Sequence, residues 1–289
     1  MKIARIETEG TIQFVARYGE QDGWRSLASL GVDTQDTAAV IAAHDDIRRR
    51  LARGEGEVIE EEVNDSCLRC PIVQPSKILA IGLNYADHIR EMRWEAPPRP
   101  MVFTKWPNSL NDPAGHIVID DHLTREGDYE AELAVVIGRR TRGVQAGDAL
   151  DRIYGYAIAN DVSARDGQRE DGQFDRSKGF DTFCPVGPWI TTADEVPDPQ
   201  SLRIRSIVNG ETRQDSSTKE MLFTVAELVA YISRGTTLEA GDLILTGTPH
   251  GVGTAMQPPQ HLRPGDEVVC EIEVLGRICN KVVSPPRRS

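Results

Sequence analysis

The sequence predicts an α+β protein that is mostly β, with a barrel- or roll-like body behind a small α+β domain. Short apolar or alternating segments typical of strands recur from residue 76 onward. They outnumber long helical segments there, which favours a roll over a doubly wound sheet. Residues 1 to about 70 mix helix-like and strand-like segments, whereas strand-like segments dominate after them. We therefore predict a small N-terminal domain at 1–70 and a larger domain at 71–289.

Composition narrows the class of protein. The 289 residues suffice for a large core, and 45 acidic against 33 basic residues give a net charge of −12. We expect no nucleic-acid partner, because such a partner needs a basic surface. We also expect no membrane span, because the apolar stretches are shorter than about 20 residues. Five cysteines and a start without an apolar leader predict a cytoplasmic protein with reduced thiols.

In the N-terminal segment, alternation of apolar side chains predicts a strand over residues 12–16. Asp36 is expected to cap one helix reaching about residue 50, with Val40, Ile47 and Leu51 on a single face. An acidic linker then leads to a Cys-x-x-Cys pair at 67–70. The sequence has no second Cys-x-x-Cys pair to complete four zinc ligands, so a zinc ribbon is not expected.

The body reads as strands separated by turns. Strands are predicted at 77–82, 101–104, 129–137, 154–159, 242–246 and 268–274, the last with an apolar face ending at Val274. A helix-like segment covers 84–94, and prolines make 96–100 a loop. Thr224 and Glu227 form a capping-box pattern that opens a helix to about residue 233.

Three carboxylates suggest a metal site. Period two places Glu130 and Glu132 on the same face of their strand, and Asp161 ends the strand predicted at 154–159. Neighbouring carboxylates inside a fold need a cation or a shared proton, and oxygen ligands suit Mg²⁺, Mn²⁺ or Ca²⁺. The alternative is an exposed strand face with scattered acids.

Two further pairs have helical spacing. Arg165 and Gln168 are three residues apart and can share a helix face, as can His88 and Glu91. A carboxylate beside His88 would orient the ring as a general base, whereas the alternative is a solvated helix face. Lys178 could polarise a carbonyl, although its polar surroundings favour a surface position. No Gly-x-Ser-x-Gly elbow, P-loop or dinucleotide fingerprint is present.

Taken together, these segments resemble the fumarylacetoacetate hydrolase family, in the form of its two-domain bacterial members. The resemblance runs from about residue 77 to 282, and its most specific stretch reads NDVSARDGQ from Asn160. The other matching segments, in the family's order around that stretch, are 81–88, 128–133, 177–188, 208–211 and 245–253. Their order and joint presence carry the assignment.

The resemblance implies a mixed β-sandwich roll as the catalytic domain. It implies Mg²⁺ or Mn²⁺, in some members Ca²⁺, held by residues matching Glu130, Glu132 and Asp161. Catalytic roles are implied for His88, Glu91 and Lys178. Substrate contacts are implied for three residues, namely Arg165, Gln168 and Thr248. A homodimer is also implied.

The expected substrate is a small 2-oxo or β-diketo acid. We expect a metal-dependent hydrolase of catabolism that cleaves a C–C bond of an acylpyruvate, with His88 deprotonating water and the enolate of a pyruvate leaving. Two alternatives use the same enolate: oxaloacetate decarboxylase, and an isomerase of the 2-hydroxyhepta-2,4-diene-1,7-dioate type. A non-catalytic protein that binds oxo acids is the least favoured, because it has no reason to keep both the carboxylates and the His–Glu pair.

Overall fold

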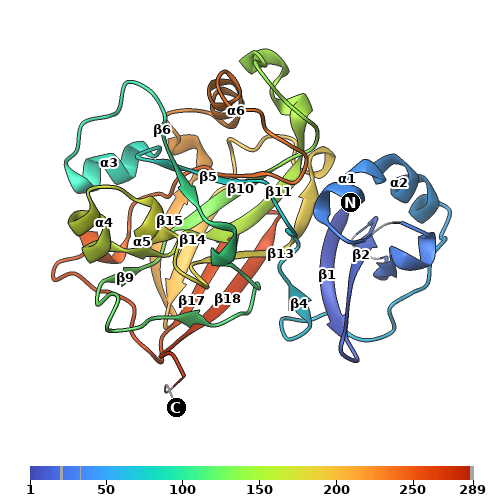
Figure 1. Ribbon diagram of the computed structural model, residues 1–289, viewed down its shortest axis with the longest axis horizontal. Helices are drawn as coiled ribbons and strands as arrows, with labels where there is room; N and C mark the ends of the chain where they lie inside the picture. The colour runs from blue at the N-terminus through green and yellow to red at the C-terminus, as the bar shows by residue number, and fades with distance from the viewer. Residues whose placement is uncertain (20–21, 33, 287–289) are drawn as a thin grey trace.

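The computed structural model describes residues 1–19, 22–32 and 34–286 and shows a mostly β chain built around one large sheet (Figure 1). Its strand order is β3-β2-β1-β13-β11-β10-β16-β5-β6, with β4 beside β1 and β7 beside β13. The strands are β1 (Lys2–Thr8), β2 (Thr11–Arg17), β3 (Arg25–Ser26), β4 (Leu68–Arg69), β5 (Ile78–Gly82), β6 (Met101–Lys105), β7 (Leu110–Asn111), β10 (Ala131–Ile137), β11 (Ile153–Asn160), β13 (Cys184–Thr192) and β16 (Leu243–Leu245). The predicted mostly-β α+β class is confirmed.

A second sheet packs on one face of the first. Its order is β15-β14-β17-β18-β8. Its strands are β8 (Ile117–Val118), β14 (Arg203–Val208), β15 (Glu211–Ser217), β17 (Glu267–Ile272) and β18 (Gly276–Val283), and a separate pair joins β9 (Gly127–Asp128) to β12 (Ser163–Ala164). Leu133 of β10 shares a core cluster with Ile204 and Val268 of the second sheet, whereas Ala134 belongs to the cluster on the other face. Alternation along β10 therefore builds two core layers, as in a sandwich.

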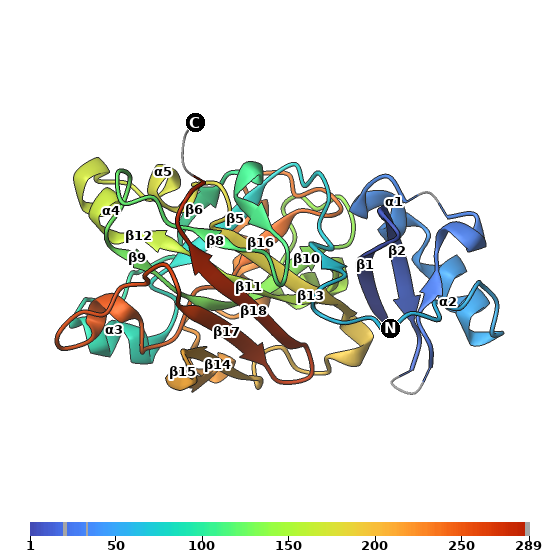
Figure 2. The same ribbon diagram turned by 90° about the horizontal axis from the view of Figure 1, so that it is seen from below.

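The N-terminal strands continue the large sheet. β1 pairs antiparallel with β13 through Lys2↔Thr191 and Ile3↔Ile190, and β4 pairs with β1. Figure 2 shows this part at one end of the molecule, with α3, α4 and α5 at the other. The division at residue 70 stays a prediction.

The helix predicted from Asp36 to about residue 50 is two helices, so that prediction was wrong in its extent. α1 (Thr37–Ala42) and α2 (His44–Ala52) meet at Ala43, whose ψ of 3° leaves the helical region. The Asp36 cap is confirmed, since its side chain accepts the Ala39 N–H. The bend lets Val40 and Ile47 both reach the core that these helices form with the large sheet.

The remaining helices are α3 (Ala86–Met92), α4 (Arg165–Asp171), α5 (Asp175–Lys178) and α6 (Val225–Ser233), and α6 opens with the predicted capping box of Thr224 and Glu227. Single turns of 3₁₀ helix lie at Ala28–Leu30, Pro107–Ser109, Ala146–Asp148, Leu150–Arg152, Ala193–Glu195, Thr218–Glu220 and Gly253–Ala255. None of the helices described is long and apolar enough to cross a membrane.

One strand ends earlier than its alternation suggested. β17 stops at Ile272, and Val274 lies in the turn before β18 with a φ of 70° and 52% of its surface exposed. The expected apolar face is therefore wrong at Val274, because the chain reverses there to pair β17 with β18.

Candidate active site

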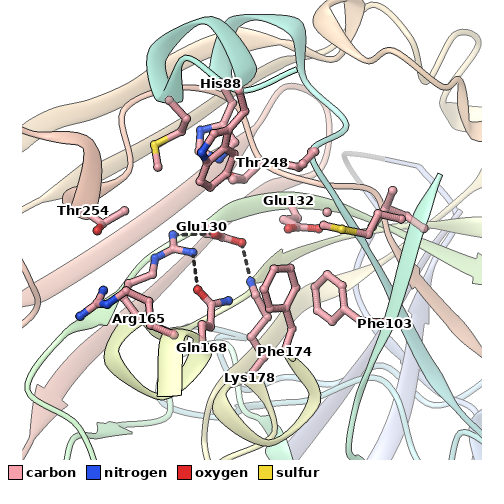
Figure 3. Close-up of a pocket in the computed structure, with 17 residues that line it drawn as sticks. His88, Phe103, Glu130, Glu132, Arg165, Gln168, Phe174, Lys178, Thr248 and Thr254 are labelled. Atoms are coloured by element: carbon pink, nitrogen blue, oxygen red, sulfur yellow. Dashed lines mark hydrogen bonds and ion pairs between the residues drawn. The ribbon is translucent and has the colours of Figure 1, made fainter. Parts of the chain in front are cut away.

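A cavity of about 410 Å³ lies between α3, α4 and the segment around β6 (Figure 3). These elements are at the end of the molecule away from the N-terminal strands (Figure 2). The volume of the cavity is within the usual range for a ligand pocket. His88 lies on one side, Glu130 and Glu132 form the floor, and Phe103 and Phe174 stand opposite Arg165.

The three predicted carboxylates meet at the floor of this cavity. β10 and β11 run antiparallel with Ala131 opposite Asn160, so the end of β11 lies beside the start of β10. The Asp161 N–H donates to the Glu130 carbonyl at 2.9 Å and fixes this register. Glu130, Glu132 and Asp161 are all buried, and one oxygen from each lies within 4.8 Å of the others. The exposed-face alternative is wrong.

Cations compensate two of the three carboxylates. Lys178, from α5, donates to Glu130 Oε2 at 2.8 Å and to Asp161 Oδ2 at 2.6 Å. Arg165, at the start of α4, donates to Glu130 Oε1 at 2.6 Å. Glu132 receives only the backbone N–H of Gly247, at 2.7 Å, among the contacts of the described residues. The polar neighbours of Lys178 had favoured the surface, yet its side chain is 3% exposed.

The pKa values follow this asymmetry. Burial raises the pKa of Glu130, but Lys178 and Arg165 outweigh it and bring it to about 2. Burial raises the pKa of Glu132 well above its ordinary value, and the charges of Asp161 and Glu130 raise it further. Glu132 can therefore ionise only at a high cost without another cation. Three close carboxylates, one lacking a cation, are a donor set that fits a divalent metal ion.

His88 faces the triad from above. Its ring lines the cavity, and the residue is 7% exposed, so the solvated-face alternative is wrong. Nδ1 lies 3.3 Å from Glu91 Oε2, and the Glu91 carboxylate also accepts the Gly251 N–H. Glu91 thus occupies one ring nitrogen and leaves Nε2 for the cavity. The ring of Trp94 packs against the His88 ring in a T-shaped arrangement, with 6.2 Å between the ring centroids.

The expected substrate contacts also line the cavity. Arg165 Nη1 donates to Gln168 Oε1 at 3.2 Å, so the two share a face of α4 as their spacing predicted. Thr248 Oγ1 donates to the Ala131 carbonyl at 2.9 Å and accepts from Gln214 at 2.8 Å, and this holds the hydroxyl at the cavity wall. The structure therefore brings all nine predicted site residues together.

Two buried site residues were missed from the sequence. Lys105 is 1% exposed and donates to Asp161 Oδ1 at 2.7 Å and to the Lys178 carbonyl. Asp128 is 0% exposed and accepts from Arg165 Nε at 2.9 Å. Asp128 has the same strand parity as Glu130 and Glu132, a signal that could have found it. Lys105 ends an unremarkable strand and carries no such signal.

A glycine-rich turn at residues 247–254 connects Glu132 to the cavity wall. Gly247 has a φ of 95°, and a Cβ there would lie 2.9 Å from Asn84 Cβ and 3.1 Å from the Ile81 carbonyl oxygen. Only glycine combines this conformation with this close approach. The turn can thus bring the Gly247 N–H to the Glu132 carboxylate. It also places the next residue, Thr248, at the cavity wall.

Comparisons with known proteins agree with this geometry. The family profile described as "Fumarylacetoacetate (FAA) hydrolase C-terminal" matches residues 77–283. The chain is 45% identical over 239 residues to the mitochondrial oxaloacetate tautomerase FAHD2A of Bos taurus, covering 82% of this chain and 75% of that one. It is 44% identical over 218 residues to oxaloacetate tautomerase YisK of Bacillus subtilis, covering 74% and 72%.

Solved structures extend the likeness to the whole chain. The fumarylacetoacetate hydrolase of Exiguobacterium antarcticum matches at a TM-score of 0.84 and 38% identity, covering 99% of this chain and 100% of that one. A maleylpyruvate hydrolase of Sphingobium sp. SYK-6, solved with manganese(II) and pyruvate, matches at 0.81 and 29% with the same coverage.

Proposed function

Because the chain belongs to the fumarylacetoacetate hydrolase family, we propose that it is a metal-dependent enzyme that interconverts the keto and enol forms of a 2-oxo acid. The observation that carries the proposal is the His88 ring, held by Glu91 and facing three carboxylates across a closed-in cavity. Tautomerisation needs one group that moves a proton at C3 and a site that stabilises the enolate. The two relatives named oxaloacetate tautomerase make oxaloacetate the first substrate to test.

Glu130, Glu132 and Asp161 would hold Mg²⁺ or Mn²⁺, with Ca²⁺ as a third candidate. The ion would supply Lewis-acid stabilisation of the negative charge on the enolate oxygen. The matched maleylpyruvate hydrolase was solved with manganese(II), which supports Mn²⁺ as the first ion to test.

The side chains of this chain would handle binding and proton transfer. Arg165 and Gln168 present donors to the cavity and would orient the substrate oxygens, and Thr248 would contact the substrate from the cavity wall. His88 Nε2 would take a proton from C3, and a proton would be delivered to the 2-oxo oxygen. The enol would therefore form with no net gain or loss of protons. The Lys178 ammonium, beside Glu130 and Asp161, is placed to donate to the same oxygen.

Hydrolysis of an acylpyruvate is the second candidate. The His88–Glu91 pair favours it, because the same imidazole can take a proton from water that attacks the distal carbonyl. The maleylpyruvate hydrolase among the matched structures lends it further support. Decarboxylation of oxaloacetate, the third use of the enolate, needs no base.

One experiment separates these reactions. Oxaloacetate, pyruvate and acetylpyruvate are incubated in D₂O with Mn²⁺, Mg²⁺ or EDTA, and proton NMR follows C3 exchange and released pyruvate. Metal-dependent C3 exchange of oxaloacetate faster than pyruvate release supports the tautomerase. Pyruvate from acetylpyruvate identifies the hydrolase, and pyruvate from oxaloacetate at the rate of exchange identifies the decarboxylase. If none of the substrates changes in a metal-dependent way, the proposal is contradicted. The cytoplasmic location, the homodimer and the role in catabolism stay predictions.

A further inference from the structure

Two carboxylates of α3 that do not line the cavity attach the helix to its surroundings. Asp87 Oδ1 accepts the His88 N–H at 2.7 Å, and its Oδ2 accepts the Ser216 hydroxyl at 2.5 Å and lies 2.9 Å from His250 Nδ1. Glu91, one turn later, accepts the Gly251 N–H. Residues i and i+4 share a helix face, so both carboxylates dock α3 on the turn that follows β16.

That turn, residues 247–254, is itself fixed to the segment 128–132, which carries Glu130 and Glu132 of the triad. Gly247 donates to Glu132, and the Thr248 hydroxyl donates to the Ala131 carbonyl. At the other end, Gly253 N–H donates to Asp128 at 2.8 Å. Any contact that fixes α3 to residues 247–254 therefore also fixes His88 relative to the triad.

The other polar attachments that the described residues give α3 lie at its start or are weak. Asn84 anchors the preceding residues by donating to the Phe223 and Thr246 carbonyls, at 3.1 and 2.8 Å. Arg90 pairs with Glu220 at 3.1 Å, but its side chain is 68% exposed, and such pairs contribute little. Beyond α3 the chain enters the proline loop. Beyond Asn84, the buried side chain of Ile89 packs α3 on the core, and the carboxylates of Asp87 and Glu91 supply the polar contacts that orient the helix.

His250 contacts the Asp87 carboxylate, but its side chain is not part of the hydrophobic core. It is 43% exposed, whereas Asp87 is 11% exposed. Neither side chain lines the cavity. The Asp87 carboxylate thus joins α3 to β15 through Ser216 and to residues 247–254 through His250.

We propose that the Asp87–His250 contact is a latch that holds α3 in the orientation presenting the His88 ring to the triad. Asp87 and His250 are positioning residues, because they act through His88 and touch no reacting atom. The inference rests on the proposed function, in which His88 moves the proton at C3. The latch should therefore govern the rate of proton transfer and leave substrate and metal binding unchanged.

The kinetic test uses His250→Ala, His250→Asn, Asp87→Ala and the double variant, with exposed His122→Ala as the matched control. We expect His250→Ala to lower kcat for C3 exchange about tenfold, with KM and Mn²⁺ affinity within about twofold of wild type. His250→Asn should restore most of kcat, because its amide N–H takes the place of the His250 Nδ1 and can donate to Asp87. The double variant should be no slower than Asp87→Ala, since coupled residues are not additive. Wild-type kcat in His250→Ala, or additive losses, would overturn the latch.

A second readout needs no turnover. Hydrogen–deuterium exchange of the peptide covering 86–92 is compared in the substrate-free proteins by mass spectrometry. We expect faster exchange in His250→Ala than in wild type and His122→Ala, and equal rates would overturn the latch. If wild type shows no C3 exchange with any metal, the proposed function fails, and the exchange of α3 still decides whether Asp87 and His250 hold the helix.

Discussion

Replacing Glu132 by Gln should stabilise the metal-free protein and abolish its stabilisation by Mn²⁺. Burial and the charges of Asp161 and Glu130 raise the pKa of Glu132 well above its ordinary value. The folded metal-free protein therefore binds a proton that the unfolded chain releases at neutral pH. Stability then falls as pH rises from the unfolded pKa toward the raised folded pKa, by about 1.4 kcal/mol per pH unit. Gln needs no proton, and its amide oxygen can still accept the Gly247 N–H.

With Mn²⁺ bound, the wild type should become more stable than the Glu132→Gln variant. An ion bound only by the folded state stabilises it by about 4 kcal/mol at a thousandfold excess over Kd. At about 2–4 °C per kcal/mol for a chain of this size, the wild-type Tm should rise by about 10 °C. The neutral amide of the variant is a weaker ligand than the Glu132 carboxylate, so Glu132→Gln should gain little from the same concentration of Mn²⁺.

The assay is a thermal melt at pH 6, 7 and 8, with EDTA or with Mn²⁺. In EDTA the variant should melt above wild type, by a margin that grows about 3–5 °C per pH unit until the pH reaches the raised pKa of Glu132. In Mn²⁺ the wild type should melt higher. Glu126→Gln is the control, because Glu126 pairs with exposed Arg169 outside the triad. The reasoning is refuted if the two proteins melt together in EDTA at every pH, or if Mn²⁺ does not stabilise the wild type.

Three further predictions concern single side chains. His88→Ala should keep Mn²⁺ affinity, measured by calorimetry, and lose about 10²–10⁴-fold in kcat for C3 exchange; an unchanged kcat would exclude His88 as the proton carrier. Burial raises the pKa of the Cys70 and Cys184 thiols to about 12, so iodoacetamide at pH 8 should label Cys67 before either, as peptide mass spectrometry would show. Earlier labelling of Cys184 would contradict its burial. Lys105→Met should lower the free energy of unfolding by about 3–5 kcal/mol in urea, because it leaves Asp161 without one of its two cations; a loss below about 1 kcal/mol would contradict that role.

The triad could be predicted because local geometry determines most of it. Strand period two fixes Glu130 and Glu132 on one side, and antiparallel pairing brings the end of the next strand, Asp161, beside them. The His88–Glu91 and Arg165–Gln168 pairs are likewise local, since each lies three residues apart on one helix. The parity of Glu130 and Glu132 and the two helical pairs are signals within a few residues, and placing Asp161 beside them needs only that its strand pairs with theirs.

The positions of the buried lysines depend on tertiary contacts instead. Lys178 lies in α5, a four-residue helix too short for a periodic pattern, and it reaches the triad only because α5 packs beside β6. Lys105 comes from a strand 56 residues before Asp161. The break at Ala43 has the same origin, because helix propensity continues across it while the core requires both Val40 and Ile47.

The charges of the site suggest an order of binding. Its buried carboxylates are Asp128, Glu130, Glu132 and Asp161, against the cations Lys105, Arg165 and Lys178. In the metal-free protein the raised pKa of Glu132 favours its protonated form, and the remaining charges of the site cancel. A divalent ion that displaces this proton would make the site net positive by one, and the carboxylate of a 2-oxo acid would then neutralise it. Charge on the enolate would develop beside the ion and Lys178 in a cavity of low dielectric, where such interactions are strong. Metal should thus bind before substrate, and substrate affinity should depend on metal even in variants that cannot move the proton.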